Sequence, residues 1–150
     1  LGAILFADLS ARRIKDVKFR WEDILSFDGE TGPYLQYSLV RMRSIMAKFG
    51  ENVPTVFDEK ALSSEEESAL VRSLSLFPVY LEKAEKEREP FVLAQYLVEL
   101  ARTFNKFYTH HRILDAKEPK KSSRLVLVKV SYDVLFSGLK LLGIPAPEKM

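Results

Sequence analysis

Aromatic and basic side chains repeat along one stretch of this sequence at the spacing of an α-helix. Five residues follow one another at intervals of three and four: Tyr34, Tyr37, Arg41, Ser44 and Lys48. This spacing places them on one helix face. Unpaired nucleic-acid bases stack on aromatic rings for about 1–3 kcal/mol each, and neighbouring cations attract phosphates. The face therefore suits single-stranded nucleic acid. The alternative, that both tyrosines are half-buried against other helices while the basic groups only solubilise, stays open from spacing alone.

The two histidines are poor candidates for catalysis or metal binding. His110 and His111 are adjacent near the predicted end of a helix, where neighbouring side chains point about 100° apart. We interpret them as helix-end charges or solvent contacts. The sequence also has no glycine-rich phosphate loop and no Gly-x-Ser-x-Gly motif.

Acidic residues suggest no chemistry either. The runs at 63–67 and 82–89 are interpreted as solvated faces, because the first begins a helix and the second has mixed charge. Nothing near Glu22, Asp23 and Asp28 supports an acid–base site. We therefore expect no catalytic, cofactor-binding or metal-binding residue in this chain.

The composition is that of an ordinary folded protein. Of 150 residues, 47% are apolar and 29% charged, and the formal net charge is +2. This length suits one domain, and no apolar run approaches the roughly 20 residues of a membrane span. Cysteine is absent, which is compatible with the cytoplasm. The chain begins at Leu1 inside an apolar run, so we expect a piece of a larger protein.

The stripe belongs to a predicted helix with clear ends. Thr31 offers an N-cap hydroxyl and Pro33 fits the first turn, whereas Gly50 stops the helix. An apolar stripe on the same helix is expected to face inward: Leu35, Leu39, Met42, Met46 and Phe49.

Further helices follow along the chain. A capping box, Ser63 with Glu66 or Ser64 with Glu67, predicts the next helix, which Pro78 breaks or kinks. A shorter piece at 79–88 and a central helix at 90–110 come next. After a basic loop at 116–123, residues 124–143 have a β-branched start that could be a strand, but their three–four spacing over five turns favours a helix. With four or five helices, the predicted fold is an all-α helical bundle.

Long ordered motifs resemble those of arginyl-tRNA synthetases. Residues 7–45, which contain FDGETGPYLQYSLVRMRSI, resemble the segment that joins the class I catalytic domain to the C-terminal anticodon-binding domain. Residues 90–114 and 122–150, which contain RLVLV, GLKLLGI and PEKM, resemble that helical domain itself. The resemblance implies residues 1–30 as the end of the catalytic domain and the junction, and residues 31–150 as the α-helical anticodon-binding domain.

The same resemblance implies a function. The parent enzyme would activate arginine with ATP and Mg²⁺ and load it onto tRNA(Arg), while this segment would hold the anticodon stem and loop, with no DNA or membrane partner. The HIGH-type and KMSK-type ATP motifs are missing from the sequence, so the chain alone is expected to be catalytically silent.

Matching positions imply a set of RNA contacts, each with an alternative. The candidates are Tyr34, Gln36, Tyr37, Arg41, Tyr96, Asn105, Tyr108, Arg124 and Met150. Tyr96 and Tyr108 could instead be core aromatics with hydrogen-bonded hydroxyls, and Asn105 could cap or brace a loop. Glu30 departs from the amide more usual in the family, and residues 51–60 do not align. Two rival functions stay open: the anticodon domain of a related cysteine-type synthetase, and a helical protein-interaction module.

Overall fold

The computed structural model describes residues 1–12, 20–26, 29–50 and 53–147. Within them the chain is helical and has no strand. The elements are α1 (Gly2–Leu9), α2 (Trp21–Ile24), α3 (Gly32–Phe49), the 3-10 helix η1 (Glu59–Ala61), α4 (Glu65–Ser75), α5 (Phe77–Glu87), α6 (Pro90–His110) and α7 (Lys120–Leu141). The predicted all-α class is confirmed. No helix in these ranges is long and apolar enough to cross a membrane.

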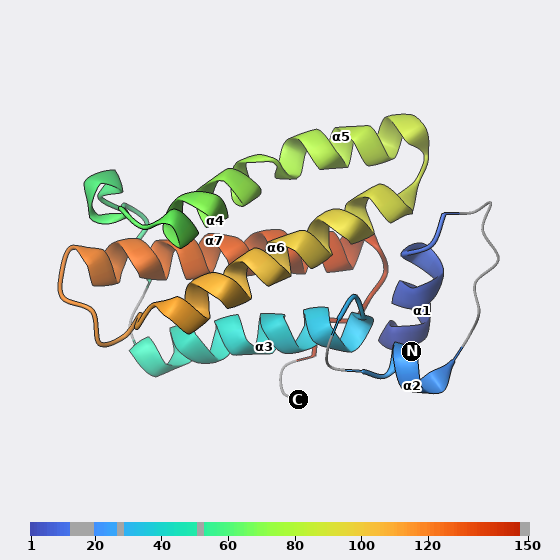
Figure 1. Ribbon diagram of the computed structural model, residues 1–150, viewed down its shortest axis with the longest axis horizontal. Coiled ribbons are helices and arrows are strands. Elements are labelled where there is room, and N and C mark those ends of the chain that lie inside the picture. Colours follow the sequence, from blue (N-terminus) through green and yellow to red (C-terminus); the bar gives the residue numbers. More distant parts are fainter. Residues whose placement is uncertain (13–19, 27–28, 51–52, 148–150) are drawn as a thin grey trace.

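The helices pack around α6, which contacts α3, α4, α5 and α7 (Figure 1). Helices α1 and α2 lie at one end of the molecule, and the connection from α6 to α7 lies at the other. The predicted stripe of α3 does face inward, since Leu35, Leu39 and Met42 are fully buried. Phe6 of α1 is buried in the same core.

Local sequence signals set several helix ends. The Thr31 hydroxyl accepts a hydrogen bond from the Tyr34 N–H at 3.2 Å, and Gly50 ends α3 in the left-handed conformation with φ of 76°. Of the two proposed capping boxes, the structure has the one formed by Ser64 and Glu67. Pro78 lies in the first turn of α5, where its missing N–H would have no helical partner.

The start of α7 differs from the prediction. The helix begins at Lys120, four residues before Arg124, so the basic loop is shorter than expected. A carboxylate outside the helix favours this earlier start, since Glu118 Oε2 accepts a hydrogen bond from the Ser122 N–H at 3.1 Å. Hydrogen bonds with the Ser122 hydroxyl and N–H lower the pKa of Glu118. Residues 125–130 are helical, so the strand alternative is wrong.

Candidate nucleic-acid interface

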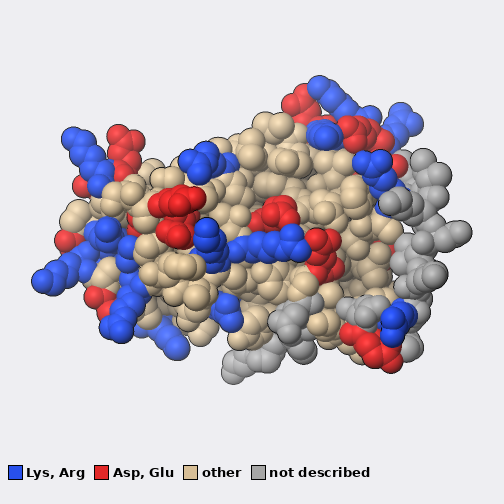
Figure 2. Space-filling view, viewed as in Figure 1, with Lys and Arg blue, Asp and Glu red and all other residues tan. Residues whose placement is uncertain are grey.

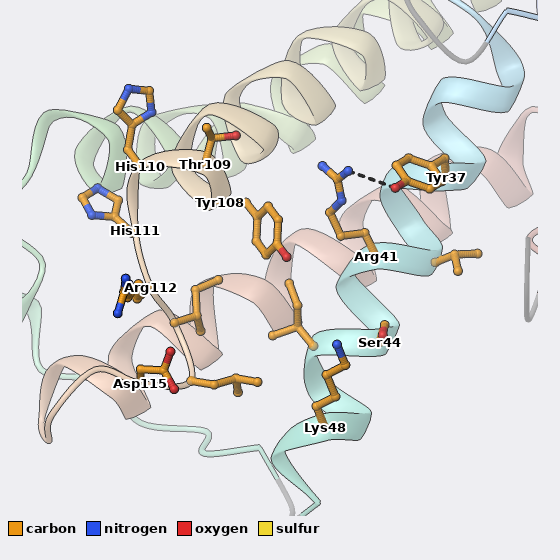
Figure 3. Close-up of a pocket in the computed structure, with 14 residues that line it drawn as sticks. Tyr37, Arg41, Ser44, Lys48, Tyr108, Thr109, His110, His111, Arg112 and Asp115 are labelled. Atoms are coloured by element: carbon orange, nitrogen blue, oxygen red, sulfur yellow. Dashed lines mark hydrogen bonds between the residues drawn. The ribbon is translucent and has the colours of Figure 1, made fainter.

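A groove of about 830 Å³ opens between α3, the end of α6 and the loop that follows it (Figure 3). Four of the five residues in the predicted stripe line it: Tyr37, Arg41, Ser44 and Lys48. The fifth, Tyr34, is half-buried and does not line the groove. The other wall is formed by residues 108–115. The structure thus joins the stripe to Tyr108, which the sequence resemblance had also indicated.

A cation lies between two exposed rings at one end of this groove (Figure 3). Arg41 Cζ is 4.7 Å from the ring centroid of Tyr37 and 5.1 Å from that of Tyr108. Arg41 Nη2 also donates to the Tyr37 hydroxyl at 3.2 Å. Tyr37 and Tyr108 remain 42% and 39% exposed. Flat aromatic surface and positive charge are therefore both open to a ligand.

A polar cluster lies behind Arg41. Asn105 of α6 accepts from Arg41 Nη1 at its Oδ1 atom, at 2.8 Å. Its Nδ2 group donates to the Tyr34 hydroxyl at 2.9 Å and to Ser38 Oγ at 3.0 Å. Tyr34 and Asn105 are both half-buried. Their contacts within the protein connect α3 to α6.

Other polar side chains also line the groove. Lys48, His110 and Arg112 line it together with one acid, Asp115. Figure 2 shows Lys and Arg side chains gathered, with some acids among them, at the end of the molecule where the α6–α7 connection lies. Sequence reasoning missed Arg112 and Asp115 as lining residues. Their closeness to Tyr108 in the sequence was the available signal.

Tyr96, another predicted RNA contact, lies in the interior. Tyr96 is only 4% exposed, its ring stacks on Tyr80 with centroids 5.0 Å apart, and its hydroxyl donates to the Ser73 carbonyl at 3.0 Å. Burial raises the pKa of Tyr96 well above its ordinary value. Tyr96 is thus a core aromatic with a hydrogen-bonded hydroxyl, which was the alternative to an RNA contact, and little of its surface is accessible. Gln36 is half-buried, and its Nε2 donates to the Pro145 carbonyl at 2.7 Å, which ties Pro145 to α3. Met150 itself lies outside the described residues.

Arg124 belongs to a buried network and not to the surface. Its Nε donates to Glu67 Oε1 at 2.7 Å, and the two side chains are 9% and 0% exposed. Its Nη1 donates to the Arg112 carbonyl at 2.8 Å. Arg124 therefore holds the loop that forms one wall of the groove. The expectation that the acidic run at 63–67 is wholly solvated is wrong at Glu67.

His111 is part of the same network, so its interpretation as a solvent contact is also wrong. Arg124 Nη2 lies 3.1 Å from His111 Nδ1. The other ring nitrogen, Nε2, lies 2.9 Å from Ser64 Oγ and 3.5 Å from Glu66 Oε2. His110 lies outside the network, exposed, with Nδ1 2.8 Å from the Lys106 carbonyl.

The Glu67 carboxylate gives a prediction for acid stability. Burial raises its pKa, but hydrogen bonds from the Ser64 N–H and from Arg124 outweigh this, and the net shift is downward. Because the pKa is lower in the folded state, the ionised carboxylate stabilises the fold at pH values above its unfolded pKa of about 4.3. This stabilisation is lost as pH falls through the folded pKa. We expect the difference in free energy of unfolding between the wild type and Glu67→Gln to shrink as pH falls below about 4. Denaturant titrations at several pH values measure it, and a constant difference would contradict the assignment.

The fold and groove define an all-α bundle domain with a groove lined in part by aromatic and basic side chains. A family model described as "DALR anticodon binding domain" matches residues 35–150, so the chain belongs to that family. It is 46% identical over 151 residues to an arginine–tRNA ligase of Clostridium botulinum and 47% identical to one of Clostridium beijerinckii. Each match covers 100% of this chain and 27% of the relative.

Solved structures agree with these relatives. The Thermus thermophilus arginyl-tRNA synthetase superposes with a TM-score of 0.92 at 40% identity, over 99% of this chain and 26% of that one. The Plasmodium falciparum enzyme gives 0.87 at 30% identity, with the same two coverages. The chain thus spans about a quarter of the proteins it matches. The resemblance to arginyl-tRNA synthetases stated from the sequence motifs is confirmed.

Proposed function

We propose that this chain binds the anticodon stem and loop of tRNA(Arg) and positions that RNA for an arginine–tRNA ligase of which it is a part. The observation that supports this best is the guanidinium of Arg41 between the exposed rings of Tyr37 and Tyr108. The family and the names of the relatives support the choice of RNA.

The geometry suits an unpaired loop better than a duplex. Bases in a duplex are stacked on each other, whereas loop bases can turn outward and stack on Tyr37 or Tyr108. The lining residues of α3 from Tyr37 to Lys48 extend over about 16 Å of helix, which is room for a few nucleotides. Lys48 and Arg112 would attract the phosphates, while Arg41 supplies charge beside the stacked bases.

The bond-making steps are proposed to lie elsewhere in the parent enzyme. Among the described residues, no group of three or more His, Asp or Glu side chains could hold a metal ion. We also propose that residues 1–30 are the end of the catalytic domain and the junction, that residues 31–150 bind the anticodon, and that the protein is cytoplasmic. An RNA contact from Met150 remains a prediction.

Loss of either exposed ring is expected to weaken RNA binding. A hairpin RNA with an arginine anticodon loop should bind Tyr37→Ala and Tyr108→Ala about five- to a hundredfold more weakly than wild type, because each variant loses one stacking surface. Fluorescence anisotropy measures the Kd. Phe136→Ala is the matched control, since Phe136 is also 39% exposed but does not line the groove. Equal losses in all three variants would contradict the proposed site.

Salt and sequence dependence of the same titration test the rival functions. Contact with three or four phosphates of a single strand gives a slope of about −2 to −3 for log affinity against log salt. A protein-interaction module would bind the RNA weakly with little salt dependence. Hairpins with altered anticodon bases separate tRNA(Arg) from a cysteine-type partner, and equal binding of every anticodon would exclude a specific reader.

A further inference from the structure

The side-chain amide of Asn105 makes all of its donated hydrogen bonds within the protein. Both amide hydrogens are used, one toward the Tyr34 hydroxyl at 2.9 Å and one toward Ser38 Oγ at 3.0 Å. Its oxygen accepts from Arg41 Nη1 at 2.8 Å. A guanidinium can only donate, so the amide oxygen must face Arg41 and the orientation of the amide is fixed. No N–H of Asn105 is left for a base.

From this geometry we propose that Asn105 is a positioning residue. It holds the guanidinium of Arg41 between Tyr37 and Tyr108 and does not itself contact RNA. The inference rests on the proposed function and revises the expectation that Asn105 is an RNA contact. Tyr34 and Ser38 belong to the same support, because they fix the amide that fixes Arg41.

Arg41 requires such a support because its other contacts do not fix its place. An arginine side chain has several rotatable bonds, and cation–π contacts with two rings tolerate sliding. The remaining hydrogen bond goes to Tyr37, which lies one turn away on the same helix and is 42% exposed. Asn105 comes from α6 and is half-buried. It is therefore the anchor that relates Arg41 to the opposite wall of the groove and prepares the site before RNA arrives.

Ser38 shows that the support is built in and not incidental. Its hydroxyl is completely buried and donates to the Tyr34 carbonyl at 2.9 Å. Its oxygen can then accept from Asn105. Ser38, Asn105 and Arg41 are thus joined by a continuous series of hydrogen bonds. Each of these side chains has a partner within the protein, as buried polar groups require.

A double-mutant cycle with the RNA hairpin tests the proposal. Arg41→Ala and Asn105→Ala should each weaken binding by about tenfold. The double variant should be no weaker than Arg41→Ala alone, because Asn105 acts through Arg41. If the losses in affinity of the two single variants multiply in the double variant, the inference is overturned.

Two further variants serve as controls. Asn105→Ser, which cannot reach Arg41, is measured in parallel in case the alanine variant does not fold, and thermal unfolding of every variant is followed. Gln95→Ala is the control: Gln95 is a half-buried amide on α6 that does not line the groove, and it should bind RNA as wild type does.

The motion of Arg41 gives a readout that does not depend on RNA. Heteronuclear NMR relaxation of the Arg41 Nε–H group should show an ordered side chain in the wild type and rapid motion in Asn105→Ala and Asn105→Ser. Asn105→Asp keeps an oxygen opposite the guanidinium and should restore the order. An unchanged Arg41 signal in Asn105→Ala, or no restoration by aspartate, would overturn the positioning role. If Arg41 moves as expected but the wild type and Arg41→Ala bind the hairpin equally, then the proposed function fails and the positioning role stands.

Discussion

Replacing Arg124 with methionine is expected to lower the free energy of unfolding by about 3–5 kcal/mol, because it leaves a carboxylate buried without its cation. Glu67 is fully buried and receives the Arg124 Nε–H at 2.7 Å. The same substitution removes the donors to the Arg112 carbonyl and to His111 Nδ1. Methionine roughly keeps the volume, so loss of the ion pair and its hydrogen bonds dominates. Denaturant unfolding at neutral pH measures the change.

Two variants separate this effect from a general loss of packing. Arg124→Met combined with Glu67→Gln removes both charges and should recover a large part of the lost stability. Arg102→Met removes a guanidinium that pairs with Glu30 and Glu99, but that side chain is 44% exposed, so the expected loss is below about 1 kcal/mol. If Arg102→Met and Arg124→Met lower the free energy of unfolding by similar amounts, burial of the ion pair between Arg124 and Glu67 does not increase its contribution to stability.

Local rules predicted most of the helices because their signals act within one turn. Thr31 and the Ser64–Glu67 box set helix starts through hydrogen bonds to groups three residues away, and Gly50 ends α3 through its own left-handed conformation. The start of α7 at Lys120 was not predicted, because the carboxylate that accepts from its first turn belongs to Glu118, which lies before the helix. None of the capping motifs in the sequence includes Glu118.

The sequence predicted one wall of the candidate site but not the other. Helical spacing was enough to place Tyr37, Arg41, Ser44 and Lys48 on one face of α3, but it could not show what lies opposite. Tyr96 and Tyr108 illustrate the difference, since they lie on one helix twelve positions apart, which turns them about 120° from each other. One ring therefore packs on Tyr80 of α5 and the other reaches Arg41 of α3.

Long-range pairing was beyond the sequence altogether. Glu67 and Arg124 are 57 residues apart, and each belongs to a segment that looked solvated or surface-bound when considered alone. Only the packing of α4 against α7 makes their burial together possible. The loop beside the groove depends on this pair, so the shape of the candidate site depends on contacts that no local pattern encodes.

Gly138 is expected to be the position of α7 that tolerates a side chain least well. A Cβ atom there would lie 2.4 Å from Leu97 Cδ2 and 2.8 Å from its Cδ1. Leu97 is fully buried on α6 and cannot swing aside without disturbing the core. Gly138→Val should therefore lower the free energy of unfolding by about 3 kcal/mol, at the upper end of what overpacking does.

Neighbouring and compensating variants make this second test specific. Ser137→Val adds the same branched side chain at the exposed preceding position of α7 and should change stability by less than about 1 kcal/mol. Leu97→Ala alone should cost about 2–5 kcal/mol, yet combined with Gly138→Val it should cost less than the sum, because the valine methyl groups enter the space that leucine leaves. Additive losses would mean that the two helices do not depend on this close approach.

Since α6 carries Asn105 and Tyr108, a change in how α6 packs on α7 should also weaken RNA binding in Gly138→Val, even though Gly138 does not line the groove.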